Sequence, residues 1–222
     1  MASPDFLYLR EDEGELNEFQ LASRLSYFFW STMPDSTLSA LAYSGKLTAP
    51  EVLARRVERM LDDPRSQRFS DSFASQWLAL DTLGTMPPDS KLFRFYNASL
   101  EAAMLKETRQ FFGHVLQQNR SVRDFIDSDY TFLNGNLASL YDVPFRSGKR
   151  DADNGGLILT KLPPGSPRGG ILGHASVLTL TSNGVETSPV TRGVWVLDHF
   201  LGTPPPPPPK EVPALVPDLN GA

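Results

Sequence analysis

The chain has 222 residues, enough for one domain with a buried core or for two small ones. Its net charge of −5 and the lack of a large basic cluster argue against nucleic-acid binding. It contains no cysteine, which excludes disulfides, thiolate metal sites and thioether haem attachment within this sequence. No run approaches the roughly 18 apolar residues of a membrane span, and the first residues lack the pattern of a secretion signal.

Residues 16–144 are expected to form a helical domain after a lead-in of residues 1–15. Apolar side chains recur here at helical spacing, in runs separated by Pro, Gly and capping residues, which is typical of a helical bundle. The expected helices are residues 17–31, 36–44, 50–63, 65–80 and 98–118, followed by short helical pieces at 122–127 and 135–143. Asn97 can cap the longest of them. The aromatic groups Phe28-Phe29-Trp30 and Phe111-Phe112 are expected in the core.

The rest of the chain divides into a connector, a second unit and a tail. Residues 145–167 are expected to be the connector, because much of this stretch is polar and glycine-bearing; its run GLILTKLP is the one strand-like segment. Residues 168–203 are expected to form a smaller, truncated helical domain. Residues 204–222 are expected to be a polyproline spacer and tail, since consecutive prolines adopt the stiff polyproline II helix. The predicted fold class is all-α, with minor β content in the connector.

The clearest helix of the chain lies in this second unit. Ser188 can cap it, Pro189 suits its first position, and Gly202 can close it. Apolar side chains recur along one side at helical spacing: Val190, Val194, Leu197 and Leu201, widened by Val196 and Phe200. The opposite side carries Thr191, Arg192, Trp195, Asp198 and His199. Because an indole on a polar face indicates a second contact, we expect this helix to be held on two sides.

Arg192 and Trp195 share one face of that helix, with Gly193 beside them where alanine would be favoured by roughly 1 kcal/mol. A glycine at such a position indicates that another segment approaches closely. We expect this face to pack on the N-terminal bundle, with Arg192 reaching a helix C-terminus or a carboxylate. The alternative is an open face that receives a further domain.

Two histidines of the second unit are candidate ligands. His174 and His199, on adjacent expected helices, could bind a metal or face a neighbouring haem, or each could satisfy a local backbone group. On the longest expected helix, Glu107 and His114 lie two turns apart, but no His-Glu-x-x-His spacing accompanies them.

The glycine-bearing segment before the second unit has two interpretations. Residues 165–170, GSPRGG, could cradle an anion on free N–H groups with Arg168 adding charge, although neither a P-loop nor a dinucleotide fingerprint is present. Alternatively, Gly169 and Gly170 permit a tight turn and close packing. Further along, Asn183-Gly184 could form a two-residue hairpin turn, but a loop between two helices is preferred.

Four strings of residues carry a family resemblance. They are RLSYFFWSTMPD, FASQWLAL, DYTFLNGNLASLY and PRGGILGHASVLTLTSNGVETSPVTRGVWVLDHFLGTPPPPPP, and the match runs roughly from Leu16 to Pro213. The chain resembles the planctomycete-type family of large envelope proteins, which carry a planctomycete cytochrome C domain beside several domains of unknown function. The resemblance spans two of those adjoining domains, whose activity is not established in the family.

In relatives the proline run is typically followed by a segment with a Cys-x-x-Cys-His haem-attachment motif. This sequence stops before any such motif, so it looks like a fragment cut at the proline spacer. The resemblance therefore implies no cofactor in this fragment, a c-type haem in the rest of the parent protein, and an adjoining haem-bearing domain as the partner. It also implies a periplasmic or cell-envelope location, although this sequence shows no targeting signal.

The leading hypothesis is a non-catalytic docking module that positions a cytochrome-c-type domain beyond the proline spacer. No catalytic constellation is recognised, so an enzymatic role stays open. One alternative is part of an envelope redox or degradative enzyme whose site another domain completes; it requires a shared cleft of Arg168, His174, Arg192 and His199. Another is a polysaccharide- or protein-binding module with an exposed Trp195 as anchor. The candidate functional cluster is Arg168, His174, Arg192, Trp195 and His199.

Overall fold

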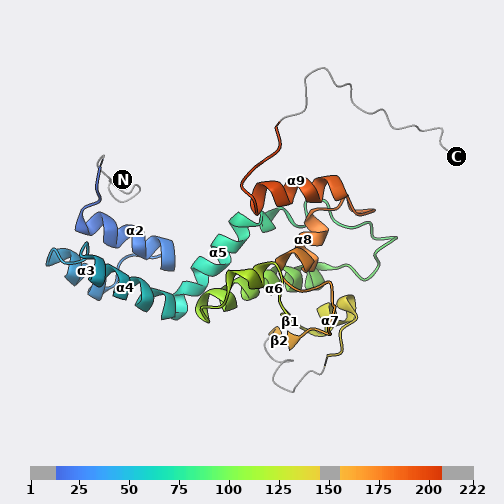
Figure 1. The fold of residues 1–222 in the computed structure, drawn as a ribbon, viewed down its shortest axis with the longest axis horizontal. Helices are drawn as coiled ribbons and strands as arrows, with labels where there is room; N and C mark the ends of the chain where they lie inside the picture. The colour runs from blue at the N-terminus through green and yellow to red at the C-terminus, as the bar shows by residue number, and fades with distance from the viewer. Residues whose placement is uncertain (1–13, 146–155, 207–222) are drawn as a thin grey trace, which may run out of the picture.

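The computed structural model describes residues 14–145 and 156–206 of the chain. Predictions for residues 1–13, 146–155 and 207–222 lie outside the described residues. Within the described residues the fold is mostly helical, and the one sheet has two strands (Figure 1). The expectation of an all-α fold with minor β content is confirmed.

Three helices form the N-terminal part: α2 (Glu18–Trp30), α3 (Ser36–Tyr43) and α4 (Pro50–Asp62). Asn17 caps α2 and Asp35 caps α3, because each side chain accepts hydrogen bonds from N–H groups of the first turn. The Trp30 side chain is fully buried, and its Nε1–H donates to the Met60 carbonyl oxygen at 3.0 Å. The indole therefore joins α2 to α4.

One expectation about the aromatic core is wrong. Phe29, Trp30, Phe111 and Phe112 are buried, but Phe28 is 56% exposed. Successive residues of a helix are about 100° apart, so three consecutive aromatic side chains cannot all face one core.

Helices α5 (Gln67–Trp77) and α6 (Ala98–Gln117) form the centre of the molecule. α5 leads from the N-terminal part to α6, which lies between the other elements (Figure 1). The Asn97 side chain accepts from the N–H groups of Ser99 and Leu100, so the predicted cap of the longest helix is confirmed.

The sheet pairs β1 (Tyr130–Leu133) with β2 (Ile158–Lys161) in antiparallel register, with Thr131 opposite Thr160. The strand-like run of the connector is thus confirmed as β2. Its partner β1 carries no comparable signal, because all four of its side chains are buried and give no alternation of apolar and polar residues. α7 (Gly135–Tyr141) follows β1 directly.

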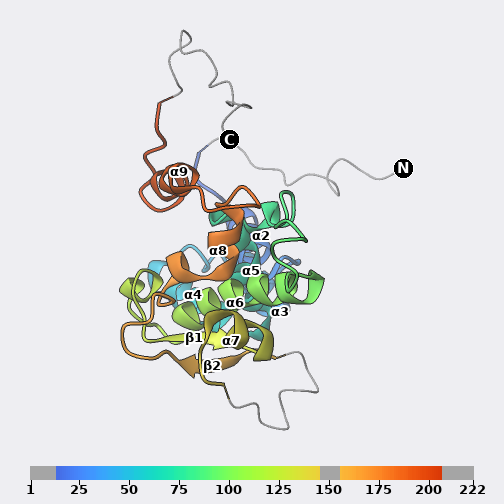
Figure 2. The ribbon, with the colours of Figure 1, turned by 90° about the vertical axis from the view of Figure 1, so that its right-hand side faces the viewer.

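Two helices follow the sheet: α8 (Ala175–Leu180) and α9 (Pro189–His199). Between them an isolated bridge joins Ser182 to Thr187, around Gly184 with its φ of +81°. Both predicted features of this segment are therefore present, since a hairpin-like turn forms within the loop that joins the two helices. In both views α8 lies between α9 and α6, and the sheet lies on the other side of α6 (Figure 2).

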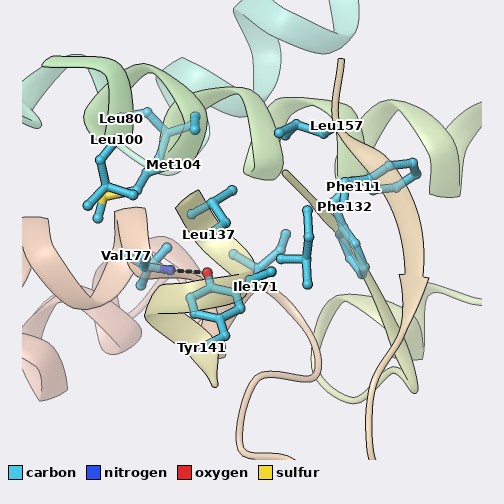
Figure 3. Packing of buried hydrophobic residues seen from close by; sticks show 14 of the residues in the cluster. Leu80, Leu100, Met104, Phe111, Phe132, Leu137, Tyr141, Leu157, Ile171 and Val177 are labelled. Carbon is cyan, nitrogen blue, oxygen red and sulfur yellow. Dashed lines mark hydrogen bonds between the residues drawn. The ribbon is translucent and has the colours of Figure 1, made fainter. Parts of the chain in front are cut away.

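Buried apolar side chains form two clusters. The smaller one belongs to the N-terminal part and includes Trp30, Leu38, Leu47 and Met60. The larger one contains Phe111 of α6, Leu137 of α7, Ile171 just before α8 and Val177 within it (Figure 3), and also Trp195 of α9. The second unit therefore shares the core that surrounds α6.

Two glycines let the segment before α8 lie close to the backbone at residues 126–128. A Cβ at Gly169 would lie 2.3 Å from the Ser128 carbonyl oxygen, and one at Gly170 would lie 2.5 Å from the Ile126 carbonyl oxygen. Gly170 also has a φ of +72°, which side chains rarely adopt. These contacts support the interpretation of both glycines as residues for a tight turn and close packing.

We predict that Gly169→Ala lowers the free energy of unfolding by roughly 1–3 kcal/mol, because its Cβ would overlap backbone that leads into β1. Gly193→Ala in α9 is the matched control. Nothing lies within 4 Å of a Cβ there, so alanine should stabilise the helix by roughly 0.5–1 kcal/mol. Urea unfolding measures both, and shifts of the same sign would contradict this assignment of the two glycines.

Candidate functional site

The five side chains of the predicted cluster lie in three different places. Arg168 and Arg192 line one pocket, and His174 is buried in a polar network between α6 and α8. Trp195 and His199 hold α9 on the rest of the molecule. A cleft shared by both arginines and both histidines is not present.

α9 is attached to the core through the face that carries Trp195. The indole is 6% exposed, and its ring centroid lies 5.6 Å from that of Phe200. The opposite stripe is open to solvent, with exposed fractions of 78% for Val190, 43% for Val194, 36% for Leu197 and 63% for Leu201. The expectations of a helix held on two sides and of an exposed Trp195 are therefore wrong. Periodicity identifies two faces but not the buried one, and here the bulkier aromatic side chains are buried.

Arg192 ties α9 to the end of α8. Its Nε–H donates to Thr181 Oγ1 at 3.1 Å, and an Nη2–H donates to the Leu178 carbonyl oxygen at 3.3 Å. A cation is favoured at the C-terminal end of a helix, so the expectation that Arg192 reaches such an end is confirmed. The helix is α8, however, and not one of the N-terminal bundle. The expectation of a close approach at Gly193 is wrong, because no atom of another segment lies within 4 Å of a Cβ at that position.

His199 and Trp77 join α9 to the end of α5 by two hydrogen bonds. The Trp77 Nε1–H donates to the His199 carbonyl oxygen at 2.6 Å, and His199 Nδ1 lies 2.6 Å from the Trp77 carbonyl oxygen. Because a carbonyl oxygen only accepts, Nδ1 carries a proton. This face of α9 thus packs on the N-terminal bundle as expected, and His199 satisfies a backbone group.

A network of buried polar side chains joins α6, β1 and α7 to α8. Its members are Glu107, Thr108, Thr131, Tyr141, His174 and Ser176. The Thr131 and Tyr141 hydroxyls donate to the two carboxyl oxygens of Glu107, at 2.7 and 2.6 Å. The backbone N–H of Ala175 in turn donates to the Tyr141 hydroxyl at 2.7 Å, as the dashed line in Figure 3 shows. Every member is buried, so this network has no direct access to solvent.

His174 lies in the middle of the network. Its Nδ1 is 3.0 Å from Thr108 Oγ1, and its Nε2 is 3.4 Å from Thr131 Oγ1. Because Thr131 donates its single proton to Glu107, it can only accept from His174, which places the imidazole proton on Nε2. Nδ1 then accepts from Thr108, whose oxygen accepts from Ser176 at 2.7 Å. The hydrogen bonds therefore run in one direction. The Ser176 hydroxyl donates to Thr108, Thr108 to His174, His174 to Thr131, and Thr131 to Glu107.

Burial sets the charges in this network. It raises the pKa of Glu107 to about 7, against the opposing effect of the hydrogen bonds from Tyr141 and Thr131. Burial, together with the nearby Arg168 guanidinium, lowers the pKa of His174 to about 3. His174 is therefore neutral at physiological pH, so its 4.0 Å approach to Glu107 is not an ion pair. Glu107 and His174 therefore help to join α6 to β1 and α8, and because both side chains are buried a substrate cannot reach them.

In the sequence Glu107 stands out only beside His114, as a pair without a metal-binding spacing, whereas in the structure it is a central residue of the buried network. The structure separates it from His114, which lines a different surface groove. A signal for Glu107 does exist in the sequence. Leu100, Met104 and Phe111 form the buried stripe of α6, and Glu107 occupies the remaining position of that stripe at helical spacing. A carboxyl group in an apolar stripe needs buried hydrogen-bond donors opposite it.

The pocket that contains Arg168 and Arg192 has a volume of about 350 Å³. It lies between the loop around Phe93, α7 and the segment from α8 to α9. Neither His174 nor His199 lines it. Across residues 14–145 and 156–206, no group of three or more His, Cys, Asp or Glu side chains is placed to hold a metal ion. No helix in those ranges has the length and apolar character needed to cross a bilayer.

Two family models match the chain. One is described as PSD4, a protein of unknown function (DUF1592), and matches residues 16–143. The other is described as PSCyt3, a protein of unknown function (DUF1588), and matches residues 168–222. Both are planctomycete cytochrome c-associated domains, so the resemblance to two adjoining domains of that kind is confirmed. No curated protein and no solved structure matches.

We predict that Trp195→Ala lowers the free energy of unfolding by about 3–5 kcal/mol, because it leaves a large void where α9 meets the core. Val190→Ala, on the exposed face of the same helix, is the control and should change stability by under about 0.5 kcal/mol. Guanidinium unfolding curves compare the two. Equal losses would contradict attachment of α9 through the face that carries Trp195.

The variant Glu107→Gln tests the raised pKa of the buried carboxyl group through the pH dependence of the free energy of unfolding. A folded-state pKa of about 7, against an ordinary 4.5, means that the native state holds this proton more tightly than the unfolded chain. The stability that Glu107 contributes is therefore full below about pH 4.5 and is lost as pH rises through about 7. Glutamine does not titrate, so the stability of the wild type relative to Glu107→Gln should fall by on the order of 2–3 kcal/mol between pH 5 and 8. A difference that stays constant or grows with pH would contradict the raised pKa.

Proposed function

We propose that this chain, which belongs to the PSD4 family of proteins of unknown function, is a non-catalytic docking module that positions a c-type cytochrome domain of its parent protein. The observation that carries this proposal is the outer face of α9, meaning the exposed side chains of Val190, Val194 and Leu197 in the helix and of Leu201 two residues beyond its end. Single exposed apolar side chains are common on proteins, but a whole stripe on one helix is typical of an interaction surface.

The outer face of α9 is presented rigidly, because the inner face is fixed at three points. Trp195 packs in the core, Arg192 donates a hydrogen bond to the end of α8, and His199 forms a hydrogen bond with Trp77 of α5. A surface that is already ordered loses little conformational entropy when a partner binds. The geometry therefore favours docking on α9 over a role in which the helix moves.

The partner is expected to follow the proline run. Gly202, with a φ of +60°, follows α9 closely, and the sequence then has six consecutive prolines at positions 204–209, a composition for which a stiff spacer is expected. A partner domain in the same chain is held at a raised effective concentration near α9, which strengthens docking without any further contact. The cytochrome c association of both families supports a haem-bearing domain as this partner. In this proposal the haem belongs to the partner, and the same association supports an envelope location.

Charge placed on the outer face of α9 should release the partner. We expect Val194→Asp combined with Leu197→Asp to increase the radius of gyration of the haem-loaded parent protein in small-angle X-ray scattering. The reason is that a carboxylate buried in an apolar interface is strongly unfavourable. Val122→Asp is the matched control, since Val122 is 75% exposed and lies outside α9. An unchanged radius of gyration in the α9 variant would rule out docking through this face.

A further inference from the structure

The pocket next to α8 is built from both family-matched regions of the chain. Phe93 and Leu140 come from the first region, while Arg168, Leu178 and Arg192 come from the second. Its volume of about 350 Å³ lies within the range of small-molecule sites in proteins.

The two sides of the pocket are held in place by backbone contacts. The Asp89 N–H donates to the Gly184 carbonyl oxygen at 2.8 Å, which ties the loop that carries Phe93 to the turn between α8 and α9. A Cβ at Gly184 would lie 2.9 Å from the Pro87 carbonyl oxygen, so the two backbones are in close contact. The pocket is therefore preformed, and a ligand would not need to order it.

Arg168 and Arg192 bring two half-buried positive charges to the pocket. A guanidinium group has five N–H donors, and these arginines use only a few of them, on Gly173, Leu178 and Thr181. All of those acceptors are neutral carbonyl or hydroxyl oxygens. Within the described part of the chain, neither arginine forms an ion pair. Each can therefore still bind an anion.

The buried carboxyl group of Glu107 does not neutralise this pocket by direct contact. The Arg168 guanidinium stacks 4.5 Å from the ring centroid of Tyr141, whose hydroxyl in turn bonds Glu107. Among the residues that line the pocket, the acidic one is Glu186, which is exposed to solvent. Two cations thus face one solvated carboxylate, which leaves an excess of positive charge.

The remaining wall is largely apolar and aromatic, with Phe93, Phe95, Met104, Leu140 and Leu178 among its residues. Guanidinium groups recognise carboxylates through paired hydrogen bonds, and an apolar wall favours a hydrocarbon chain or ring. We propose that this pocket binds a small amphiphilic anion, with a medium-chain carboxylate as the simplest case. The anionic head meets Arg168 and Arg192, and the apolar body lies against the aromatic side chains.

Isothermal titration calorimetry of the whole chain tests the chemistry of the ligand with three probes. Octanoate should bind, whereas octanamide, which lacks the charge, and inorganic phosphate, which lacks the apolar body, should bind at least about tenfold more weakly. Equal binding of octanamide or of phosphate would overturn the proposal. So would the absence of octanoate binding at millimolar concentration.

Three variants test the location of the site. Arg192→Gln removes one charge, and Thr179→Phe fills the pocket while leaving both arginines in place. Both should weaken octanoate binding by about tenfold or more. Arg94→Gln is the matched control, because Arg94 is exposed and does not line the pocket, and its octanoate affinity should equal that of the wild type. If Arg192→Gln fails to fold, unchanged binding by Thr179→Phe alone overturns the proposal.

Discussion

The buried network around Glu107 and His174 is the constraint on which the rest of the structure depends. A polar group sealed from water costs roughly 1–3 kcal/mol when it lacks a partner, and here the partners come from α6, β1, α7 and α8. Apolar contacts alone tolerate small shifts between elements, whereas a shift of one residue would leave several of these groups without partners. The network therefore sets the position of α8 relative to α6, β1 and α7.

The positions of α9 and of the pocket follow from this attachment. Arg192 donates a hydrogen bond to the end of α8. The position of α9 is therefore set by the helix that His174 directly precedes. Gly169 and Gly170 allow the preceding segment to lie against the backbone at residues 126–128. Because the pocket is lined from both family-matched regions, neither region would form it alone. The outer face of α9 is likewise fixed in direction only while α9 stays on the shared core.

Local features of this protein could be predicted from its sequence, and pairings between distant segments could not. Caps such as Asn97 and Ser188 mark the starts of helices, because a cap acts within its own first turn. The buried face of α9 depends on what lies opposite, and periodicity alone favoured the stripe opposite Trp195. His174 could be singled out as an unusual residue, but its partner Thr108 is 66 residues away in the sequence and has no motif of its own. Burial then decides the charge of such a group, and burial is a property of the folded chain.

The central claim is that the two family-matched regions unfold as one unit held by the Glu107–His174 network. Native-state hydrogen exchange tests this most directly, with the backbone N–H of Ala175 as the reporter, because it donates to Tyr141 across the two regions. The account predicts that this amide exchanges with the same opening free energy as the amides in the middle of α6, including that of Phe111. Exchange of Ala175 through a much smaller opening, with α6 still protected, would show that the second region detaches by itself and would contradict the account.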